Sequence, residues 1–541
     1  MFTCIITGSN NNNLIRHTLN LLINFNVKHI IVVTNQSCST FIQQEYQLFD
    51  VLFSRESFLN RNEACNYALQ YITTGRIHLL ESGATPTEKS IEIHRKADQF
   101  QVVCGLFTRV YDFDKNYKNT LTVQKPYKIS DFRLHASNKL KGSWMLYANN
   151  NSSMDVSGVR QVNGFDAYFC VEGVTENADL MYSLNNIGFD IKISEEANIE
   201  SYTVLDNSQL QCGKLKTLYV WFTDRCNYHC KMCRIGQRAY STAVYKEPSL
   251  EEMHELILKA QEIGISKIEL FGGEMLMRKE LLSVIEFCNH HNIEIGFVSN
   301  GSLITSEISK QFFHLGVKDI PISLDAPVSE LNNWIRGMNT WNKTMEGIEN
   351  LKKYNNTFSI FNVIMKQNYK YMSDMIRLAK KLGAKSVSFQ PVSSRQGGLE
   401  YSELAINYSD IPELKRAISL AFKTAEQLNI PIRSQQLVKT IPEYFLRDEK
   451  LYIQKGCTLP LSEAVITKTN KLQLCFSLFG PKELYRKANW LNFESAWESA
   501  SYQELQKMAI TGQCPGCLAN CSDLNYLFNS EIGSTSKKEL N

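Results

Sequence analysis

The chain has 541 residues, of which 43% are hydrophobic and 21% are charged. These proportions are typical of a folded, soluble protein, and the length allows several domains of about 150 residues each. The 58 basic and 55 acidic residues leave a net charge of +3, which gives no reason to expect nucleic acid or an anionic membrane as the main partner. Since no run approaches about 18 apolar residues and no signal peptide is recognisable, we expect a cytoplasmic protein.

The first two hundred residues alternate apolar, strand-like runs with amphipathic helical stretches. Strands are expected at Thr3–Thr7, His29–Val33 and Arg76–Leu80. This alternation predicts an α/β domain over residues 1–204. A polar stretch without clear periodicity, residues 205–215, marks a linker to the next domain.

The order of motifs in this first domain resembles the family 2 glycosyltransferases of the GT-A fold. The motifs that carry the resemblance are Arg61–Asn66, Leu80–Gly83, Gly164–Asp166 and Glu176–Leu180. In active members of that family, an Asp-x-Asp pair after a strand holds a divalent metal on the nucleotide diphosphate. Oxygen ligands of this kind suit magnesium or manganese.

Two residues that the family uses for catalysis are replaced in this sequence. The acidic pair reads Glu81-Ser-Gly83, so the second carboxylate is missing, and Asn177 stands where the general base is expected. A neutral amide cannot take a proton from an acceptor hydroxyl. The domain is therefore expected to be degenerate and to bind a sugar or a partner. The alternative is an active transferase that uses Glu81, Glu176 or Asp179 differently.

A second and more regular β/α alternation begins at Leu218. Its expected strands are Leu218–Phe222, Lys267–Phe271, Glu294–Val298, Asp319–Ser323, Phe361–Met365 and Ser386–Phe389. A helical pattern follows each strand; the first one opens on a capping box of Ser249 and Glu252 and ends at Gly264, which suits a left-handed cap. Six such units predict a partial (βα)6 barrel, in which the loops at the carboxyl ends of the strands carry the chemistry.

Eight of the fifteen cysteines fall in two close sets. In a reducing compartment, close cysteines indicate metal or redox sites, whereas the scattered ones are expected to be buried apolar residues. The first set, Cys226, Cys230 and Cys233, has CxxxCxxC spacing directly after the first barrel strand. Three thiolates on an iron–sulfur cubane leave one iron open to a cofactor. Zinc is the alternative, but a structural zinc site wants a fourth ligand, and His229 is poorly placed to be one.

This loop and the strand ends after it resemble the radical S-adenosylmethionine (SAM) superfamily. Phe271-Gly-Gly-Glu274 matches the family's GGE motif, and two further polar motifs follow the third and fourth strands. Paired glycines would let the backbone approach the ligand closely, and the glutamate would accept hydrogen bonds from the SAM ammonium group. The later motifs look like the family's ribose- and carboxylate-facing groups. The predicted SAM-binding residues are Gly272, Gly273, Glu274, Ser299, Asn300, Ser323 and Asp325.

One position departs from the family pattern, because the residue before the third cysteine is Met232 and not an aromatic residue. The soft methionine side chain can still pack near adenine. The resemblance implies that a [4Fe-4S] cluster delivers one electron to bound SAM and cleaves it to methionine and a 5'-deoxyadenosyl radical, which abstracts a substrate hydrogen. No catalytic protein residue is assigned from the sequence.

The second cysteine set resembles the Twitch domain, the single-cluster relative of the SPASM extension. Strand-like runs at Glu463–Lys468 and Leu472–Cys475 would form its hairpin. The predicted ligands of this auxiliary [4Fe-4S] cluster are Cys457, Cys475, Cys514 and Cys517, with Cys521 as a substitute or a bystander. A structural zinc site is the alternative. The predicted parts are thus a SAM core at 216–436, a Twitch domain at 437–528 and a polar tail at 529–541.

The resemblances together predict a radical SAM enzyme that receives electrons from a flavodoxin or a ferredoxin. The neighbouring sugar-type domain favours a sugar or nucleotide-sugar substrate that is oxidised or epimerised, although domain company is only associational. Peptide modification is the second candidate. A glycosyltransferase with accessory iron–sulfur domains and a non-catalytic iron–sulfur protein are the alternatives from other classes.

Overall fold

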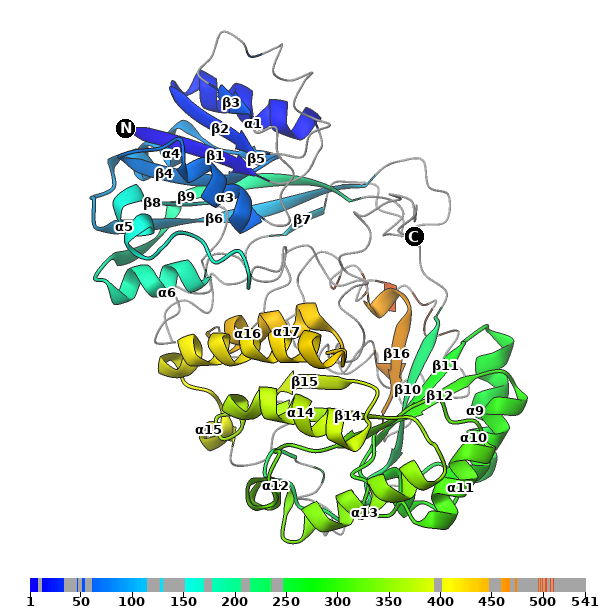
Figure 1. Ribbon diagram of the computed structural model, residues 1–541. Helices are drawn as coiled ribbons and strands as arrows, with labels where there is room; N and C mark the ends of the chain where they lie inside the picture. Colours follow the sequence, from blue (N-terminus) through cyan, green and yellow to red (C-terminus); the bar gives the residue numbers. More distant parts are fainter. Residues whose placement is uncertain are drawn as a thin grey trace, which may run out of the picture. The chain divides into compact units, whose positions relative to one another are not determined.

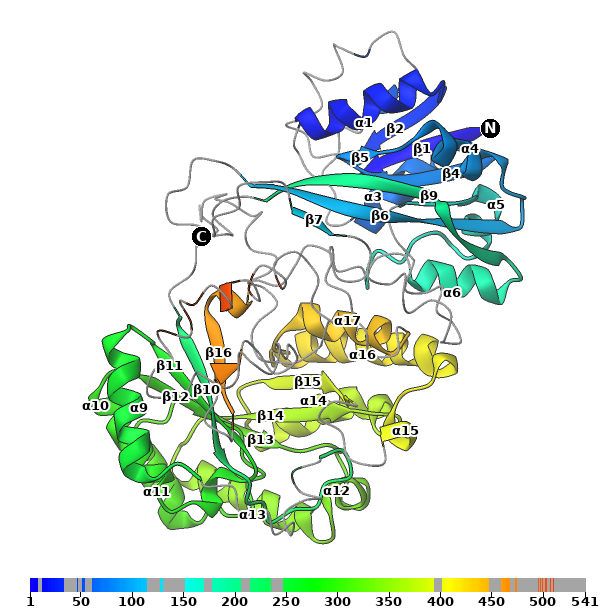
Figure 2. The same ribbon diagram turned by 180° about the vertical axis from the view of Figure 1, so that it is seen from behind.

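The computed structural model describes residues 1–7, 12–33, 46, 51–53, 61–113, 127–129, 151–169, 178–205, 215–233, 235, 247–393, 401–446, 459–467, 472–473 and a few single positions between 495 and 509. The chain divides into two compact units (Figures 1 and 2). The first is formed mainly by Met1–Gln211 and the second mainly by Cys212–Lys450 and Cys457–Ile510. No helix in these described ranges is long and apolar enough to span a bilayer.

The first unit is built on one large sheet with strand order β3-β2-β1-β4-β8-β6-β9-β5, and β7 pairs with β6. The strands β1 to β4 run parallel, and β8 is antiparallel to both of its neighbours. The three strands expected from the sequence are confirmed. The strands are β1 (Phe2–Thr7), β2 (His29–Val33), β3 (Val51–Phe53), β4 (Arg76–Glu81), β5 (Ala84–Thr85), β6 (Gln101–Phe113), β7 (Tyr127–Ile129), β8 (Ser152–Asp155) and β9 (Asp190–Leu205).

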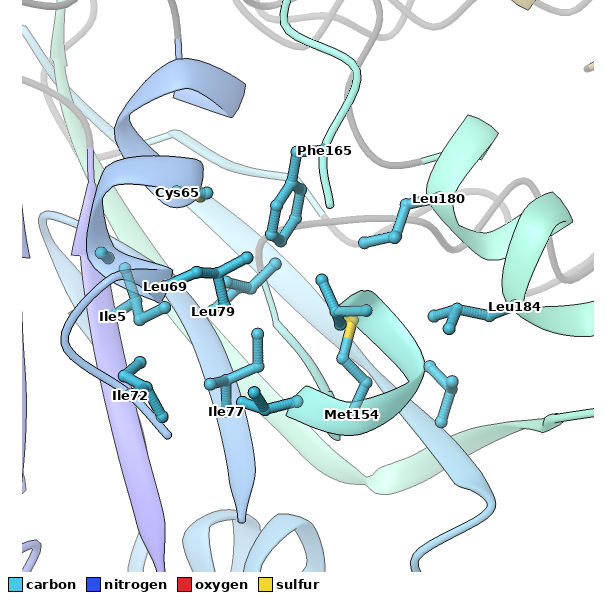
Figure 3. Close-up of a cluster of buried hydrophobic side chains, with 14 of the residues drawn as sticks. Ile5, Cys65, Leu69, Ile72, Ile77, Leu79, Met154, Phe165, Leu180 and Leu184 are labelled. Carbon is cyan, nitrogen blue, oxygen red and sulfur yellow. The ribbon is translucent and has the colours of Figure 1, made fainter. Parts of the chain in front are cut away.

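Helices cover both faces of this sheet, which explains why its parallel strands read as continuous apolar runs. One core joins Ile5 and Leu79 to side chains of α3 (Arg61–Leu69), α5 (Val156–Gln161) and α6 (Ala178–Asn186), as Figure 3 shows. The other core joins Cys4 and Leu80 to α1 (Asn12–Asn24) and α4 (Glu88–Lys96). The unit is therefore a three-layer α/β structure, as expected, while its likeness to glycosyltransferases stays a prediction.

The second unit contains the six parallel β/α strands that the sequence predicts. They are β10 (Thr217–Thr223), β11 (Lys267–Gly272), β12 (Glu294–Phe297), β13 (Ile320–Ser323), β14 (Phe358–Ile364) and β15 (Val387–Pro391). The strands β10, β11 and β12 pair in parallel in that order, and so do β13, β14 and β15. A single bridge between Ser299 and Ile322 links the two groups. The strand β14 begins earlier than expected, at Phe358.

Helices lie along the outside of these strands, with α9, α10 and α11 on one side of β10–β12 in both views (Figures 1 and 2). The capping box of Ser249 and Glu252 is confirmed, and Gly264 has the expected positive φ. The helices are α9 (Leu250–Glu262), α10 (Leu281–His290), α11 (Ser306–His314), α12 (Ser329–Arg336), α13 (Thr340–Lys353), α14 (Met372–Leu382), α15 (Tyr401–Leu404), α16 (Ile411–Leu428) and α17 (Gln435–Leu446).

The burial of β10 and β11 alternates in a way that distinguishes the two faces of the sheet. Leu218 and Val220 are buried, whereas Tyr219 and Trp221 are partly exposed. In a closed eight-stranded barrel the inner layer is a packed core. On the inner face of this open barrel, Tyr219 and Trp221 are instead partly exposed.

The described C-terminal part of the chain joins the barrel sheet. The strand β16 (Glu463–Ile466) pairs parallel to β10 and antiparallel to β17 (Leu472–Gln473), so the predicted hairpin is confirmed. The sequence pattern is irregular from Ile441 onward, but α17 continues to Leu446 despite its internal Pro442. The predicted border between 436 and 437 therefore falls inside a helix.

Candidate functional site

The three-cysteine loop begins where β10 ends, and neighbouring elements fix its backbone. The Lys231 amide donates a hydrogen bond of 2.9 Å to the Ile335 carbonyl, which attaches the loop to α12. Tyr228 is buried, and its hydroxyl donates to a backbone carbonyl at the start of α13 at 3.3 Å. The loop is thus held from two sides independently of any metal.

The three thiols differ in burial but lie close enough to interact electrostatically. Cys230 is buried, whereas Cys226 and Cys233 are partly exposed, and none of them forms a disulfide. Burial raises the pKa of Cys226 to about 11 and that of Cys230 to about 12. A metal that binds such thiols must displace their protons, and bound metal supplies the positive charge that makes this favourable.

Within the described ranges, no three His, Cys, Asp or Glu side chains converge closely enough to hold one metal ion. Thiolates that ligate an iron–sulfur cluster bind different irons and need not meet at one point. Three free thiols on one loop fit that requirement. We therefore expect Cys226, Cys230 and Cys233 to hold the cluster.

Gly272 and Gly273 bring the end of β11 against the cysteine loop. A Cβ atom at Gly272 would lie 2.1 Å from the Thr223 carbonyl oxygen, and one at Gly273 would lie 2.0 Å from the Arg225 oxygen. The amides of Gly273 and Glu274 donate to these same two oxygens, at 2.8 Å each. The glycines are thus required by close packing between two backbone segments, whereas the sequence-based reason was close approach to a ligand.

Glu274 lies beneath this contact and is only 1% exposed. Its carboxylate accepts hydrogen bonds from the Ser299 hydroxyl at 2.9 Å, the Asn300 amide at 2.7 Å and the Leu276 amide at 3.2 Å. Burial raises the pKa of Glu274, while these hydrogen bonds lower it. A carboxylate offers about four acceptor positions, so one remains for a ligand ammonium group. The same side chain also fixes the next strand end.

Asn300 joins this second strand end to the cysteine loop. Its side-chain amide donates to Asn227 Oδ1 at 2.9 Å, and Asn227 in turn donates to the Ser302 hydroxyl at 2.9 Å. Asn300 Oδ1 accepts from the Ser302 amide, also at 2.9 Å. The predicted ribose-binding motif is therefore hydrogen-bonded directly to a residue between two of the cysteines.

Asp325, at the end of β13, forms a buried ion pair with Arg336 of α12. Asp325 is 0% exposed and its Oδ2 lies 2.7 Å from Arg336 Nε, while its Oδ1 accepts from the Val363 amide at 2.8 Å. Arg336 Nη1 lies 3.9 Å from the Cys230 sulfur. Burial raises the pKa of Asp325, and Arg336 opposes that rise. Asp325 thus positions a cation beside Cys230, a predicted cluster ligand, and sequence analysis missed this arginine.

The two remaining predicted residues lie nearby. The Ser323 amide donates to the Ser299 carbonyl at 2.8 Å, which holds the third and fourth strand ends together. Met232 lies in the cysteine loop and is buried. The structure therefore gathers the predicted residues at the ends of β11, β12 and β13 around the loop that follows β10, and their contacts with SAM stay predictions.

In the first unit, two of the quoted motifs contact each other although about a hundred residues separate them. Asn62 donates to the Asp166 carbonyl at 3.0 Å, and the Asn66 side chain bonds to both the amide and the carbonyl of Phe165. The Arg61 guanidinium donates to the Leu80 carbonyl at 3.2 Å, directly before Glu81. These polar residues thus connect the start of α3 to other segments.

Several predicted residues lie outside the described ranges. They are Glu176, Asn177, Cys457, Cys475, Cys514, Cys517 and Cys521. The scattered cysteines within the described ranges, Cys4, Cys65, Cys104 and Cys288, are all buried, as expected, and form no disulfide.

Comparison with known proteins identifies the segment that carries this site. Residues 220–379 match the family model of the Radical SAM superfamily. The AdoMet-dependent heme synthase of Oleidesulfovibrio alaskensis is 32% identical over 169 residues, which are 31% of this chain and 43% of that protein. A probable GTP 3',8-cyclase of Thermococcus kodakarensis is 30% identical over 168 residues, 31% of this chain and 53% of that protein.

The similarity to these relatives covers about half of their length. Among solved structures, Streptococcus suis SuiB bound to S-adenosylmethionine gives a TM-score of 0.45 at 15% identity, covering 56% of this chain and 73% of that one.

Proposed function

We propose that this chain is a radical SAM enzyme, which cleaves SAM reductively and abstracts a hydrogen atom from a substrate, because residues 220–379 match the family model of that superfamily. The observation that carries the proposal is the joining of the GGE motif and the next strand end to the three-cysteine loop through Glu274 and Asn300. When bound, the cluster supplies one electron to SAM, and the resulting 5'-deoxyadenosyl radical takes the substrate hydrogen.

The protein's own residues hold and orient the reactants. Cys226, Cys230 and Cys233 are the proposed cluster ligands, and Arg336 places a positive charge beside the cluster's thiolates. Glu274 is the proposed acceptor for the SAM ammonium group, since it keeps acceptor capacity beyond its three protein donors. These residues sit on packed strand ends, which fixes the relative position of the two groups.

Three finer proposals rest on the sequence. A second, auxiliary cluster would be held by Cys457, Cys475, Cys514 and Cys517, and a flavodoxin or ferredoxin would supply the electron. A sugar or nucleotide-sugar substrate follows from the likeness of the first domain to glycosyltransferases, with peptide modification as the second candidate.

The test is SAM cleavage by anaerobically reconstituted protein with dithionite, measured as 5'-deoxyadenosine by mass spectrometry. We expect product from the wild type and only the no-enzyme background from a Cys226→Ala/Cys230→Ala/Cys233→Ala variant. Cys288→Ala is the matched control, because Cys288 is buried and free but lies on α10. Product formation that persists in the triple variant would refute the proposed cluster site.

Iron content and electron paramagnetic resonance test the auxiliary cluster in the same samples. Two [4Fe-4S] clusters in the wild type and one in the triple variant would support the auxiliary cluster. One cluster in the wild type and none in the triple variant would refute it. Transfer from a nucleotide sugar that survives in the triple variant would favour the glycosyltransferase alternative.

A further inference from the structure

We propose that the inner face of β10, β11 and β12 binds the substrate through Trp221, Phe271 and Val298, and that it takes an uncharged, apolar side chain of a peptide. This inference rests on the proposed function, because it assigns the molecule that gives up its hydrogen. It also reverses the order of substrate classes that the sequence favours.

The three side chains form one layer across the sheet. Trp221 and Phe271 are direct partners in the parallel register, and their rings meet edge to face with centroids 5.0 Å apart. Leu270 pairs with Phe297, so Val298 continues the same row beside Phe271. Val298 directly follows the end of β12 and is 38% exposed.

Alternation along β10 places Trp221 on the inner face. The neighbouring Phe222 is fully buried on the opposite face, where the guanidinium of Arg278 lies 4.2 Å from its ring centroid. Successive side chains of a strand point to opposite faces. Trp221 therefore points inward, and the register carries Phe271 to the same side.

This layer lies directly beneath the proposed SAM site. Phe271 immediately precedes Gly272, and Val298 immediately precedes Ser299. A radical on a bound cofactor can take a hydrogen atom only from a group held next to it. A group that packs on this layer would satisfy that condition.

The chemistry of the layer excludes some ligands and favours others. Of its three side chains only Trp221 carries a polar atom, so the layer offers little to the hydroxyl groups of a sugar. Apolar and aromatic surface instead gains free energy by covering apolar groups. This favours an aliphatic or aromatic side chain as the occupant.

The charges below the layer disfavour a nucleotide diphosphate. Lys267 Nζ lies 2.5 Å from Glu269 and 3.7 Å from Glu294, so two carboxylates share this cation. Lys267 is the one basic residue among β10, β11 and β12 as the structure describes them. Glu294 also lies 2.6 Å from Lys318 Nζ, so two lysines and two carboxylates balance here, and neither lysine is left unpaired to attract a diphosphate.

Deuterium transfer tests the inference even while the substrate is unidentified. Extract from the source organism grown in deuterated medium is separated into an anion-exchange fraction and a fraction retained on a reversed-phase column. Each is given to the reconstituted holoenzyme with SAM and dithionite. The substrate C–D bond breaks, the deuterium atom bonds to C5′, and deuterated 5'-deoxyadenosine is measured as a share of the total product.

We expect deuterium from the reversed-phase fraction, and we expect protease treatment of that fraction to abolish the transfer. In Trp221→Ala and Phe271→Ala the deuterated share should fall at least about tenfold, as a loss of about 1.4 kcal/mol of binding would produce. Trp221→Phe keeps an aromatic ring in the layer, so its deuterated share should be higher than that of Trp221→Ala. Phe313→Ala is the control, because this aromatic residue is exposed on α11.

Transfer from the anion-exchange fraction alone, from neither fraction, or from protease-treated material would overturn the inference. So would a deuterated share that the layer variants leave at the wild-type value. Each of these results still shows total 5'-deoxyadenosine, whereas a failure of the proposed function shows none.

Discussion

At the scale of single residues, loss of the buried Asp325–Arg336 ion pair should lower the free energy of unfolding more than loss of an exposed pair. Both side chains are at most 7% exposed, so replacing Arg336 with glutamine leaves a carboxylate buried without its cation. Removal of one partner of such a pair costs about 3–5 kcal/mol. We expect Arg336→Gln to lower the free energy of unfolding by that order, measured by urea denaturation of the cluster-free chain.

Two further variants separate this pair from a general effect of mutation. In Asp325→Asn/Arg336→Gln both charges are gone, so the double variant should be more stable than the Arg336 single variant. Arg377→Gln breaks an exposed ion pair with Asp374 and should cost less than about 0.5 kcal/mol. A double variant less stable than Arg336→Gln would contradict the expectation.

This pair also shows where sequence analysis stopped. The cysteines and the Gly-Gly-Glu motif are recognisable because their spacing is local, and the structure places them together. Arg336 has no such spacing: its role depends on Asp325 at a strand end and on Cys230 more than a hundred residues earlier. The glycines were found correctly but for another reason, because only the fold shows which backbone atoms approach them.

At the scale of elements, β16 should detach from the barrel sheet more easily as the pH rises. Burial raises the pKa of Glu463, at the start of β16, to about 8. The folded chain therefore keeps a proton that the unfolded chain loses near its ordinary value of 4.5, so the unfolding free energy falls between pH 4.5 and 8. In Glu463→Gln, which cannot lose this proton, we expect the unfolding free energy to fall over this pH range by on the order of 1–2 kcal/mol less than in the wild type.

The measurement is the melting temperature of the wild type and of Glu463→Gln at pH 6 and pH 9. Between pH 6 and pH 9 the melting temperature of the variant should fall by less than that of the wild type. Glu262→Gln, at an exposed position on α9, is the matched control and should follow the wild type. An equal change in both Glu463 forms would show that the carboxyl group stays ionised in the folded chain.

A buried polar network in the first unit should act in the opposite direction. His78 and His94 stack with centroids 3.9 Å apart, are both 0% exposed, and both bond to Asn151 Oδ1. Burial lowers the pKa of His78 to about 4 and lowers that of His94 well below its ordinary value. The unfolded chain therefore binds more protons between pH 6.5 and 4, and stability falls as the pH falls through that range.

Histidine-selective 13C labelling checks this directly. Of the ten histidines, two should show no titration between pH 8 and 5, and Asn151→Leu should perturb these two signals and no others. Two buried rings that titrate near pH 6.5 would contradict the assignment.

The elements themselves were largely predictable, whereas their partners were not. The six barrel strands follow from apolar runs and turn signals within short windows. The pairing of β16 with β10 joins residues more than two hundred positions apart, and no local pattern indicates it. The sequence analysis predicted the β16–β17 hairpin as part of the Twitch domain, and only the fold shows that its first strand pairs with β10.

At the scale of the whole molecule, two compact units with separate cores should respond differently to loss of the cluster. Cys226, Cys230 and Cys233 belong to the second unit, so binding of the proposed cluster would stabilise the folded state of that unit and not that of the first. We expect two calorimetric transitions in the reconstituted protein. Removal of iron should lower only one of them, and that same transition should already be low in the Cys226→Ala/Cys230→Ala/Cys233→Ala variant. The other transition, which we assign to the first unit, can be identified through His78 and His94. Its melting temperature should fall as the pH is lowered from 6.5 toward 5, whereas that of the second unit should not. If both transitions shift together on removal of iron, the units unfold as one cooperative structure, and the division into two independent cores is wrong.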